Sequence, residues 1–379
     1  MKHDYIFAGI GLASLMVLDK MLDAKLLESK KILLLESNNK NSNDRTWCFW
    51  DNKLGDFDDL VSKKWEQALF INDKQTIECL SDNANYKMIE SIRFYNYVLD
   101  KLKKYPEIVW KKENFISFED KGSEVIITSN VAKYSTAIFF NSVFDVSKIE
   151  YNKKYPLLKQ HFIGWFVKTT EPIFDANYAT FMDFSIPQKG NTRFMYVLPF
   201  SETQALVEYT LFSANLLQDN EYEEAINNYL KEKGATSFEI IKKEQGNIPM
   251  TVFPFWKNNS KNVLHIGTAG GWTKASTGYT FKNTIKQSGR LVLLLKNKTI
   301  DFRNFNKLNR FLFYDTLFVR VLYKNNDLGK KIFSNMFLKV QPKKIFKFLD
   351  EESNLKEELE IILACPKIPF IRSLLRFKW

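Results

Sequence analysis

The sequence predicts an α/β fold, in which a Rossmann-like nucleotide-binding domain is interleaved with an antiparallel-sheet domain and followed by C-terminal helices. Three observations favour this fold class. A strand, glycine turn, helix and strand open the chain, short strand-like segments dominate its middle, and helical spacing prevails after Phe281. With 379 residues, 45% of them hydrophobic, the chain is long enough for two or three domains with sizeable cores.

The first predicted element is a βαβ unit. Residues 4–8 form a short apolar run that is typical of a buried strand, and residues 12–27 carry leucines at helical spacing. A second apolar run, Ile32–Glu36, predicts another buried strand. Two parallel strands joined by a crossover helix are the beginning of a doubly wound fold.

The turn after the first strand has the sequence Gly-x-Gly-x-x-Ser. Gly9 suits a tight turn, Gly11 lets the backbone approach a pyrophosphate, and the small Ser14 permits close packing of helix on strand. Phosphates would then bind at the helix N-terminus, at Leu12 and Ala13, where free N–H groups and the helix dipole favour anions. The motif therefore predicts dinucleotide binding, with glycine packing alone as the alternative.

Two further features indicate which dinucleotide binds. Glu36 ends the second strand, 25 residues after Gly11, where an acidic side chain accepts hydrogen bonds from ribose hydroxyls. The chain has one such fingerprint, and another glycine-rich segment follows much later, at residues 265–281. This combination favours FAD, because the isoalloxazine ring of FAD reaches a distant segment of the chain.

The late segment is predicted to be a strand, a glycine turn and a helix start that contact the flavin. The candidate contacts are Gly267, Thr268, Gly271, Gly278 and Tyr279. A helix N-terminus near residues 277–279 would stabilise negative charge on a reduced flavin. An ordinary strand–turn–helix connection without a ligand is the alternative.

The pattern along the chain predicts domains that are not consecutive in sequence. A discontinuous, Rossmann-like FAD-binding domain comprises residues 1–60, 125–150 and 258–300. A substrate domain with an antiparallel sheet comprises residues 61–124 and 151–257. Residues 301–379 are predicted to form a helical, membrane-facing C-terminal region.

Positive charge is concentrated toward the C-terminal end. The chain has 55 Lys and Arg against 44 Asp and Glu, and residues 290–379 hold 19 of the basic residues, 9 of the acidic ones and 11 of the 33 Phe. A basic, aromatic tract points to an anionic surface, either lipid headgroups or nucleic acid. A solvated helical face, with the Phe side chains in the core, is the alternative.

Cysteine, histidine and hydropathy patterns limit the location and the cofactors. Three Cys without a paired motif indicate a reducing compartment, and three scattered His argue against a zinc or haem site. No apolar run reaches the roughly 18 residues of a membrane span, and the start of the chain does not resemble a signal peptide. We expect a cytoplasmic protein that binds no metal and does not span a membrane.

Several rare motifs, in order along the chain, carry a resemblance to a known family. They are DRTWCFW at 44–50, YVLPF at 196–200, ALVEYT at 205–210, GGWTK and STGYTF within 270–281, YDTLF at 314–318 and FLDEE at 348–352. With the glycine motif, they resemble the bacterial lycopene β-cyclases, a family of FAD-dependent carotenoid cyclases. The resemblance extends from about residue 4 to residue 352.

The resemblance implies an enzyme that isomerises the linear ends of lycopene to the β-ionone rings of β-carotene, without net redox change. Glu208 matches the catalytic acid of the family, and burial in an apolar pocket would raise the pKa of its carboxyl. Without the resemblance, Glu208 would be read as a solvent-facing residue of an alternating strand. Plausible cavity walls, each also a candidate for simple core packing, are Trp165, Phe166, Phe194 and Tyr196.

The resemblance also implies cofactors and partners. Reduced FAD is the expected active cofactor, NAD(P)H is a candidate source of its electrons, and Arg45 is a candidate contact to FAD, with a surface ion pair as the alternative. The substrate is expected to be apolar lycopene. The basic, Phe-rich C-terminal tract is expected to dock on an anionic membrane surface, so that the protein associates peripherally, and no nucleic acid is expected.

Two positions depart from the family pattern. Thr268 stands where related flavin hydroxylases have an Asp, which weakens one flavin contact. Tyr209 stands where the family often has a second acidic residue after the catalytic Glu, so this sequence lacks that carboxylate pair. An FAD-dependent monooxygenase or an isoprenoid reductase of the same architecture is the alternative function.

Overall fold

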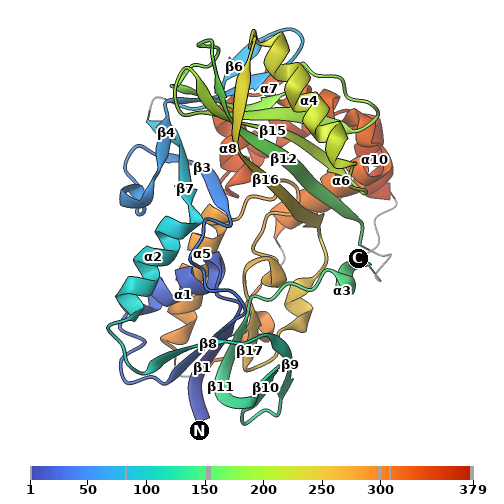
Figure 1. Cartoon of the computed structure of the whole chain (residues 1–379). Helices are drawn as coiled ribbons and strands as arrows, with labels where there is room; N and C mark the ends of the chain where they lie inside the picture. The colour runs from blue at the N-terminus through green and yellow to red at the C-terminus, as the bar shows by residue number, and fades with distance from the viewer. Residues whose placement is uncertain (1, 82, 151–154, 298–299, 307–308, 376–379) are drawn as a thin grey trace.

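Two seven-stranded sheets and a small third sheet organise the chain in the computed structural model (Figure 1). The structure describes residues 2–81, 83–150, 155–297, 300–306 and 309–375. The first sheet lies near the N-terminus of the chain, at one end of the molecule, and the second sheet lies at the other end between helices.

The first sheet has the strand arrangement of a doubly wound fold. In spatial order its strands are β8 (Ile108–Lys112), β2 (Ile32–Glu36), β1 (Lys2–Ala8), β11 (Lys133–Asn141), β10 (Val125–Ser129) and β9 (Phe115–Asp120), with β17 (Val263–His265) also paired to β11. The pairs β8–β2, β2–β1, β1–β11 and β11–β17 are parallel, whereas β10 and β9 are antiparallel. Helix α1 (Leu12–Asp23) connects β1 to β2, which confirms the predicted βαβ unit and the Rossmann-like fold class.

Three helices cover one face of the first sheet. They are α1, α2 (Ser91–Leu102) and α5 (Phe281–Leu295), and their apolar side chains form one buried cluster with sheet residues such as Phe7 and Phe140. A second buried cluster lies on the other face of the sheet. In it, Ile6 of β1 and Leu33 of β2 are buried together with Val125 of the antiparallel strand β10. Both faces are therefore covered, as the uninterrupted apolar run of β2 requires.

The second sheet is antiparallel except for one pair. In spatial order its strands are β16 (Phe238–Thr251), β12 (Leu157–Thr169), β15 (Gln204–Ser213), β14 (Thr192–Pro199), β13 (Tyr178–Asp183), β5 (Gln67–Ile71) and β6 (Thr76–Glu78), and the parallel pair is β13–β5. Successive side chains of a strand point to opposite faces of the sheet. Each long strand therefore contributes residues to two separate layers.

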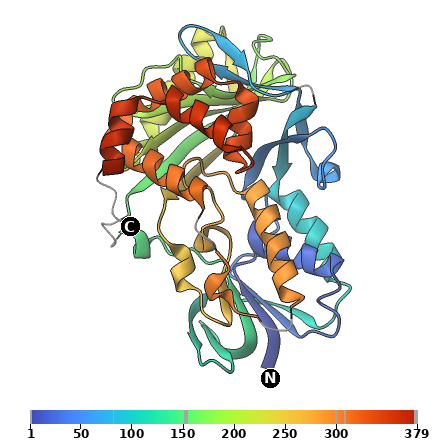
Figure 2. The same ribbon diagram turned by 180° about the vertical axis from the view of Figure 1, so that it is seen from behind.

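Helices cover both faces of the second sheet. Helix α4 (Asp219–Glu232) packs on one face. The opposite face packs against the C-terminal helices α6 (Arg310–Lys324), α7 (Gly329–Lys339), α8 (Pro342–Leu349) and α9 (Leu355–Ala364), and α10 (Lys367–Leu375) follows them (Figure 2). The predicted helical character after Phe281 is confirmed, up to the last described residue.

A small sheet lies beside the two large ones. It contains β3 (Thr46–Asn52), β7 (Ala84–Glu90) and β4 (Lys63–Trp65). The side chains of β3 include Trp47, which belongs to the core under the first sheet, and Trp50, which belongs to the core of the second. This strand therefore joins the two halves of the molecule. The short helix α3 (Ser147–Glu150) follows β11.

The observed pairing differs from the predicted assignment of residues 61–124 to the substrate domain. Strands β8 and β9 pair within the first sheet, and α2 packs on α1. Residues 91–120 therefore belong with the nucleotide-binding half. The mistake has a physical source, because an isolated strand such as β8 shows its apolar pattern but not the sheet with which it pairs.

Candidate active site

One large cavity lies between the glycine turns of the first half and the face of the second sheet that packs against the C-terminal helices. Its volume is about 710 Å³. Gly11, Leu12 and Ala13 line it on one side, and side chains of β12, β14, β15 and α7 line it on the other. The predicted dinucleotide contacts and the predicted catalytic carboxyl, Glu208, therefore open into the same space.

The N-terminus of α1 is built to receive an anion. Gly11 precedes the helix, and no side chain caps its first turn, so the N–H groups there keep their donors free. A Cβ on Gly11 would meet no atom within 4 Å, which leaves open space beside the helix end. Gly9 adopts φ +76°, and a Cβ there would lie 2.6 Å from Oγ of Ser142. These features fit the pyrophosphate of a dinucleotide.

Glu36 lies directly behind this glycine turn. One of its carboxylate oxygens accepts the N–H of Ile10 at 2.6 Å, and the other accepts the N–H of Asn38 at 3.0 Å. The side chain is buried, and Lys40 Nζ approaches it to 3.8 Å. Glu36 therefore fixes the shape of the turn, a role that the sequence did not predict. It stands at the end of β2, where a ribose is expected to bind.

Two cations stand at the rim of the cavity on the dinucleotide side. Lys40 and Arg45 both line the cavity. The Arg45 guanidinium donates from Nη1 to the main-chain oxygen of Asp44 at 2.7 Å, and its side chain is exposed. Lys40 Nζ lies 3.3 Å from the carboxylate of Asp44. Arg45 thus lines the same cavity as the N-terminus of α1, and among the described residues no ion pair joins it to Asp44 or Asp51.

The late glycine-rich segment folds against the N-terminal turn. Gly267 adopts φ +60°, and a Cβ there would lie 3.0 Å from Cβ of Ala13. Thr268 lines the cavity, and its hydroxyl pairs with that of Thr273 at 3.0 Å. Gly271 lies against Phe255 and is not among the lining residues. The segment predicted from the sequence is therefore brought to the cavity, with Gly271 behind it.

Gly278 and Tyr279 continue this segment along the cavity. A Cβ on Gly278 would lie 2.7 Å from Oε1 of Gln160, a buried oxygen for which the described residues offer no hydrogen-bond donor. Gln160 and Gly278 both line the cavity. A free buried acceptor beside a glycine is what a ring system with N–H donors, such as a flavin, would satisfy. The residues present therefore fit FAD.

Glu208 sits near the middle of β15 and faces the cavity. Leu206, Thr210 and Phe212, two and four residues away on the strand, line the same cavity. Only 7% of Glu208 is exposed. Burial, together with the negative charge of Glu244 and a hydrogen bond to it, raises the pKa of Glu208 well above its ordinary value. Burial and the neighbouring carboxyl therefore both favour the neutral form of Glu208.

Tyr209, the next residue on β15, points to the opposite face of the sheet. Its hydroxyl accepts a hydrogen bond from Arg193 Nη1 at 2.9 Å, and the same nitrogen lies 2.8 Å from Glu221 of α4. Position 209 belongs to the layer under α4. An acidic residue at this position would therefore not pair with Glu208 inside the cavity.

Aromatic side chains form the walls around Glu208. Phe194 and Tyr196 line the cavity as predicted, whereas Trp165 lies under α4 and Phe166 packs against Phe200 outside the cavity lining. Further wall residues that the sequence did not indicate are Cys48, Tyr86, Phe162, Phe181, Phe333 and Phe337. They come from five different elements, so no local motif signals them.

Hydroxyl groups in this wall contact one another. Tyr86 and Tyr196 share a hydrogen bond of 2.9 Å between their hydroxyl oxygens. Burial raises the pKa of Tyr86 and of Tyr196 well above the ordinary value, so both stay neutral. Burial also raises the pKa of the Cys48 thiol, which lies within reach of the Tyr196 hydroxyl. The wall therefore presents neutral groups to the cavity.

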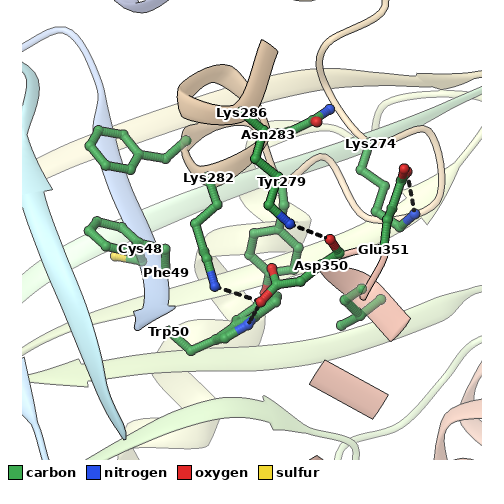
Figure 3. A pocket seen from close by; sticks show the side chains of 12 residues that line it. Cys48, Phe49, Trp50, Lys274, Tyr279, Lys282, Asn283, Lys286, Asp350 and Glu351 are labelled. Atoms are coloured by element: carbon green, nitrogen blue, oxygen red, sulfur yellow. Dashed lines mark hydrogen bonds and ion pairs between the residues drawn. The ribbon is translucent and has the colours of Figure 1, made fainter. Parts of the chain in front are cut away.

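A small adjoining pocket, of about 30 Å³, shows how the C-terminal helices are joined to the late segment (Figure 3). Asp350, at the end of α8, accepts hydrogen bonds from Lys282 Nζ at 2.5 Å and from Trp50 Nε1 at 2.7 Å. Lys274 Nζ lies 3.1 Å from Asp315 of α6 and 3.5 Å from Glu351, and both Lys274 and Asp315 are buried. The motifs around 270–281, 314–318 and 348–352 therefore meet in space.

Two negative findings hold for the part of the chain that the structure describes. No group of three or more His, Cys, Asp and Glu side chains there is arranged to hold a metal ion. None of the described helices combines the length and the apolar character that crossing a bilayer requires.

Solved structures of similar fold are flavoproteins. A geranylgeranyl bacteriochlorophyll reductase-like protein from Thermoplasma acidophilum superposes with a TM-score of 0.60 at 12% identity, covering 99% of this chain and 98% of that one. A mutant of the halogenase PltM in complex with FAD gives 0.61 at 10% identity, covering 97% and 87%. At these identities the similarity concerns the fold, and it supports the Rossmann-like FAD-binding architecture.

Sequence comparisons give relatives with one name. A lycopene beta-cyclase from Pantoea ananas is 24% identical over 304 residues, which are 77% of this chain and 74% of that protein. One from Paracoccus sp. is 29% identical over 126 residues, so the match spans 32% of that relative, and a chloroplastic enzyme of Solanum lycopersicum is matched at 24% over 58% of its length. The model of the family described as "Lycopene cyclase protein" matches residues 4–375, and this chain therefore belongs to the lycopene cyclase family.

Proposed function

We propose that this chain is a lycopene β-cyclase, which isomerises the linear ends of lycopene to β-ionone rings with reduced FAD and without net redox change. One observation carries the proposal. Glu208 is a buried carboxyl, with a pKa raised by burial and by Glu244, in an aromatic-walled cavity that continues to the open glycine turn of α1. The names of the relatives agree with this substrate.

The reaction needs a neutral acid, because an alkene is a very weak base. Glu208 donates its proton to the trisubstituted double bond at the end of lycopene, which leaves a tertiary carbocation. The electrons of a neighbouring double bond form the new C–C bond and close the ring. A proton then leaves the ring carbon and returns to the Glu208 carboxylate, so that protons and electrons balance over the cycle.

The carbocation must be stabilised without being trapped by a nucleophile. Aromatic faces attract cations and do not bond to them. Phe181, Phe194 and Tyr196 provide such faces in the cavity, and the hydroxyl of Tyr196 stays neutral. When bound, reduced FAD supplies negative charge close to the developing cation. These requirements explain why an enzyme that performs no net oxidation would retain a flavin site.

The residues that would hold FAD come from both ends of the dinucleotide-binding half. Gly9, Gly11, Leu12 and Ala13 would accept the pyrophosphate at the end of α1, with Glu36 near the ribose and Arg45 at the rim. Gly267, Thr268, Gly278 and Tyr279 would lie along the flavin. NAD(P)H is the proposed source of electrons for the initial reduction of the flavin.

We further propose that the protein docks peripherally on an anionic membrane through its C-terminal helices. A fully apolar substrate would then pass from the membrane into the cavity. Large apolar side chains are exposed along α9 and α10, namely Leu355, Leu359, Ile362, Leu363, Ile368, Ile371, Leu374 and Leu375. The basic, Phe-rich tract, residues 290–379, contains both helices, and residues 298–299, 307–308 and 376–379 of it lie outside the described part. Burial of such a surface in the interface region of a bilayer is favourable.

The test is pigment chromatography of a lycopene-accumulating bacterial host that expresses this chain. The parent is expected to convert lycopene to β-carotene. Glu208→Gln is expected to lose the conversion, and Glu239→Gln, at an exposed residue of β16, serves as the matched control. Unchanged lycopene with soluble, FAD-loaded and reduced parent would contradict the proposal. If the protein then consumed NAD(P)H in proportion to the product formed from another substrate, the monooxygenase or isoprenoid reductase would be favoured.

A further inference from the structure

We propose that Glu244 is a positioning residue, which pairs with Glu208 across Gly164 and holds the acid proton between the two carboxyl groups. The inference deepens the proposed cyclase function and rests on it. A second carboxyl is thereby assigned to the cavity. It comes from a strand distant in sequence, whereas the family often has its second acidic residue at position 209.

The strand register brings the two carboxyls together. Gly164 of β12 pairs with Glu208 of β15 on one side and with Glu244 of β16 on the other. Residues in register across neighbouring strands point to the same face of the sheet. Glu208 and Glu244 therefore stand on the cavity face, on either side of Gly164, and both line the cavity.

Gly164 makes the approach of the two side chains possible. A Cβ at this position would lie 2.7 Å from Cγ of Glu208 and 3.4 Å from Cγ of Glu244. Any larger residue would occupy the space over which the carboxyls reach each other. Glycine in the interior of a strand lowers stability unless another group needs the space. Here the two glutamate side chains use it.

The electrostatic surroundings favour one shared proton. Glu208 is buried, its side chain is hydrogen-bonded to that of Glu244, and two adjacent carboxylates cannot both ionise without repulsion. Two other titratable groups interact with the pair, Cys48 of β3 and Tyr196 of β14. Tyr86 of β7, Tyr279 of the late segment and Lys242 of β16, which lies over the Phe166 ring, line the same cavity.

The pair gives the catalytic cycle a means of recovering its proton. Before the reaction Glu208 carries the proton and Glu244 accepts its hydrogen bond. When the proton passes to the alkene, two negative charges face each other over Gly164. Their repulsion is relieved when the ring carbon releases its proton to Glu208. Glu244 thus raises the basicity of Glu208 at the step in which Glu208 must act as a base.

The test compares the pH dependence of cyclisation in the parent, Glu244→Gln and Glu239→Gln, each with FAD and a flavin reductant in lycopene-containing vesicles. The Glu244→Gln variant keeps the shape and a hydrogen bond but not the charge, so the pKa of Glu208 is expected to fall. The alkaline limit of cyclisation should move to lower pH. At the alkaline end the rate should fall on the order of tenfold relative to the parent, and at the acidic end it should fall less. A profile of unchanged shape would overturn the proposal.

A second measurement does not depend on turnover. The protonated carboxyl of Glu208 has an infrared carbonyl band that Glu208→Gln removes, and its pH titration reports the pKa directly. In Glu244→Gln the band should disappear at lower pH than in the parent, and in Glu239→Gln it should not move. An unshifted band in Glu244→Gln would refute the pairing even if β-carotene forms. A shifted band in Glu244→Gln, together with a parent protein that forms no β-carotene, would keep the pairing and refute the cyclase function.

Discussion

Gly267 and Ala13 are in contact across the dinucleotide site, because a Cβ on Gly267 would lie 3.0 Å from Cβ of Ala13. The first residue belongs to the late glycine-rich segment, and the second belongs to the first turn of α1. Glycine is needed at 267 both for this approach and for its φ of +60°. The contact therefore fixes the two halves of the predicted FAD site relative to each other.

Gly11→Ala is predicted to fold normally and to bind FAD poorly. A Cβ at position 11 meets no protein atom within 4 Å, but it projects into the space where the pyrophosphate would approach the backbone. Flavin absorbance after gel filtration, with a thermal melt, checks this. Gly289→Ala is the matched control, because it also meets no atom within 4 Å but lies in α5. Equal flavin content in both variants would contradict the prediction.

The raised pKa of Glu208 makes the stability of the fold depend on pH. The folded state holds the proton more tightly than the unfolded chain, so this contribution is fully present below the unfolded pKa. It is lost as the pH rises through the raised folded pKa. Cyclase activity, which needs the neutral acid, should fall in the same direction. Glu208→Gln should lose activity by about 10²-fold or more. Its unfolding free energy should fall less than that of the parent as the pH rises above the unfolded pKa of a Glu carboxyl, as urea denaturation at each pH would show.

Tyr209→Phe is predicted to affect stability and not catalysis. The hydroxyl of Tyr209 bonds to the buried guanidinium of Arg193 under α4, on the face of the sheet away from the cavity. Its removal should lower the unfolding free energy by about 1–2 kcal/mol, measured by urea denaturation. The kcat and KM for cyclisation should match those of the parent. A selective loss of kcat would show that the two faces of the sheet are coupled.

The exposed apolar surface of α9 and α10 should control membrane binding. Leu363→Glu combined with Ile371→Glu places two charges in this surface, and binding to anionic vesicles should weaken on the order of tenfold or more in a flotation assay. Ile116→Glu changes a similarly exposed isoleucine of β9, far from these helices, and should leave flotation unchanged (Figure 1). If both proteins float equally well, the docking surface lies elsewhere.

The buried ion pair of Lys274 and Asp315 should be costly to break from one side. Lys274→Met leaves the carboxylate of Asp315 buried without its partner at 3.1 Å, and the unfolding free energy should fall by about 3–5 kcal/mol. The double variant Lys274→Met with Asp315→Leu should recover much of this loss. A double-mutant cycle by urea denaturation measures both. Additive effects would show that the pair contributes little.

Most of the fold could be predicted because the relevant signals are local. The run Ile32–Glu36 matches β2 residue for residue, and the predicted strand at residues 4–8 lies within β1. The sheet to which a strand belongs is not a local property, and for this reason residues 91–120 were assigned to the wrong half. Strand β16 was not predicted at all, because most of its central residues are polar and exposed, as suits an edge strand, and Gly246 and Pro249 interrupt its pattern.

The difference between local signals and long-range pairing also explains which site residues could be predicted. Gly9 and Gly11 lie in a motif whose spacing has a chemical meaning, whereas Glu208 was indicated only by the family resemblance. Gly11 and Glu208 line the cavity, and Gly9 lies in the turn beside it. Glu244 lies on the unpredicted strand, and only the register with Gly164 shows that it faces Glu208. The available signal was Gly164 itself, a glycine between the apolar and aromatic residues 162–163 and 165–167 of its strand.

The ion pairs around Lys274 and Lys282 have a thermodynamic consequence. The late segment and the start of α5, which border the proposed flavin site, are also the segments to which α6 and the end of α8 are fastened. If a ligand at this segment orders these ion pairs, it also strengthens the attachment of α6 and α8. A ligand that contacts Ile345 or Leu349 of α8, which line the cavity, would then strengthen flavin binding by the same factor. We therefore expect flavin and a ligand under these helices to show reciprocal linkage, so that each would raise the affinity of the protein for the other.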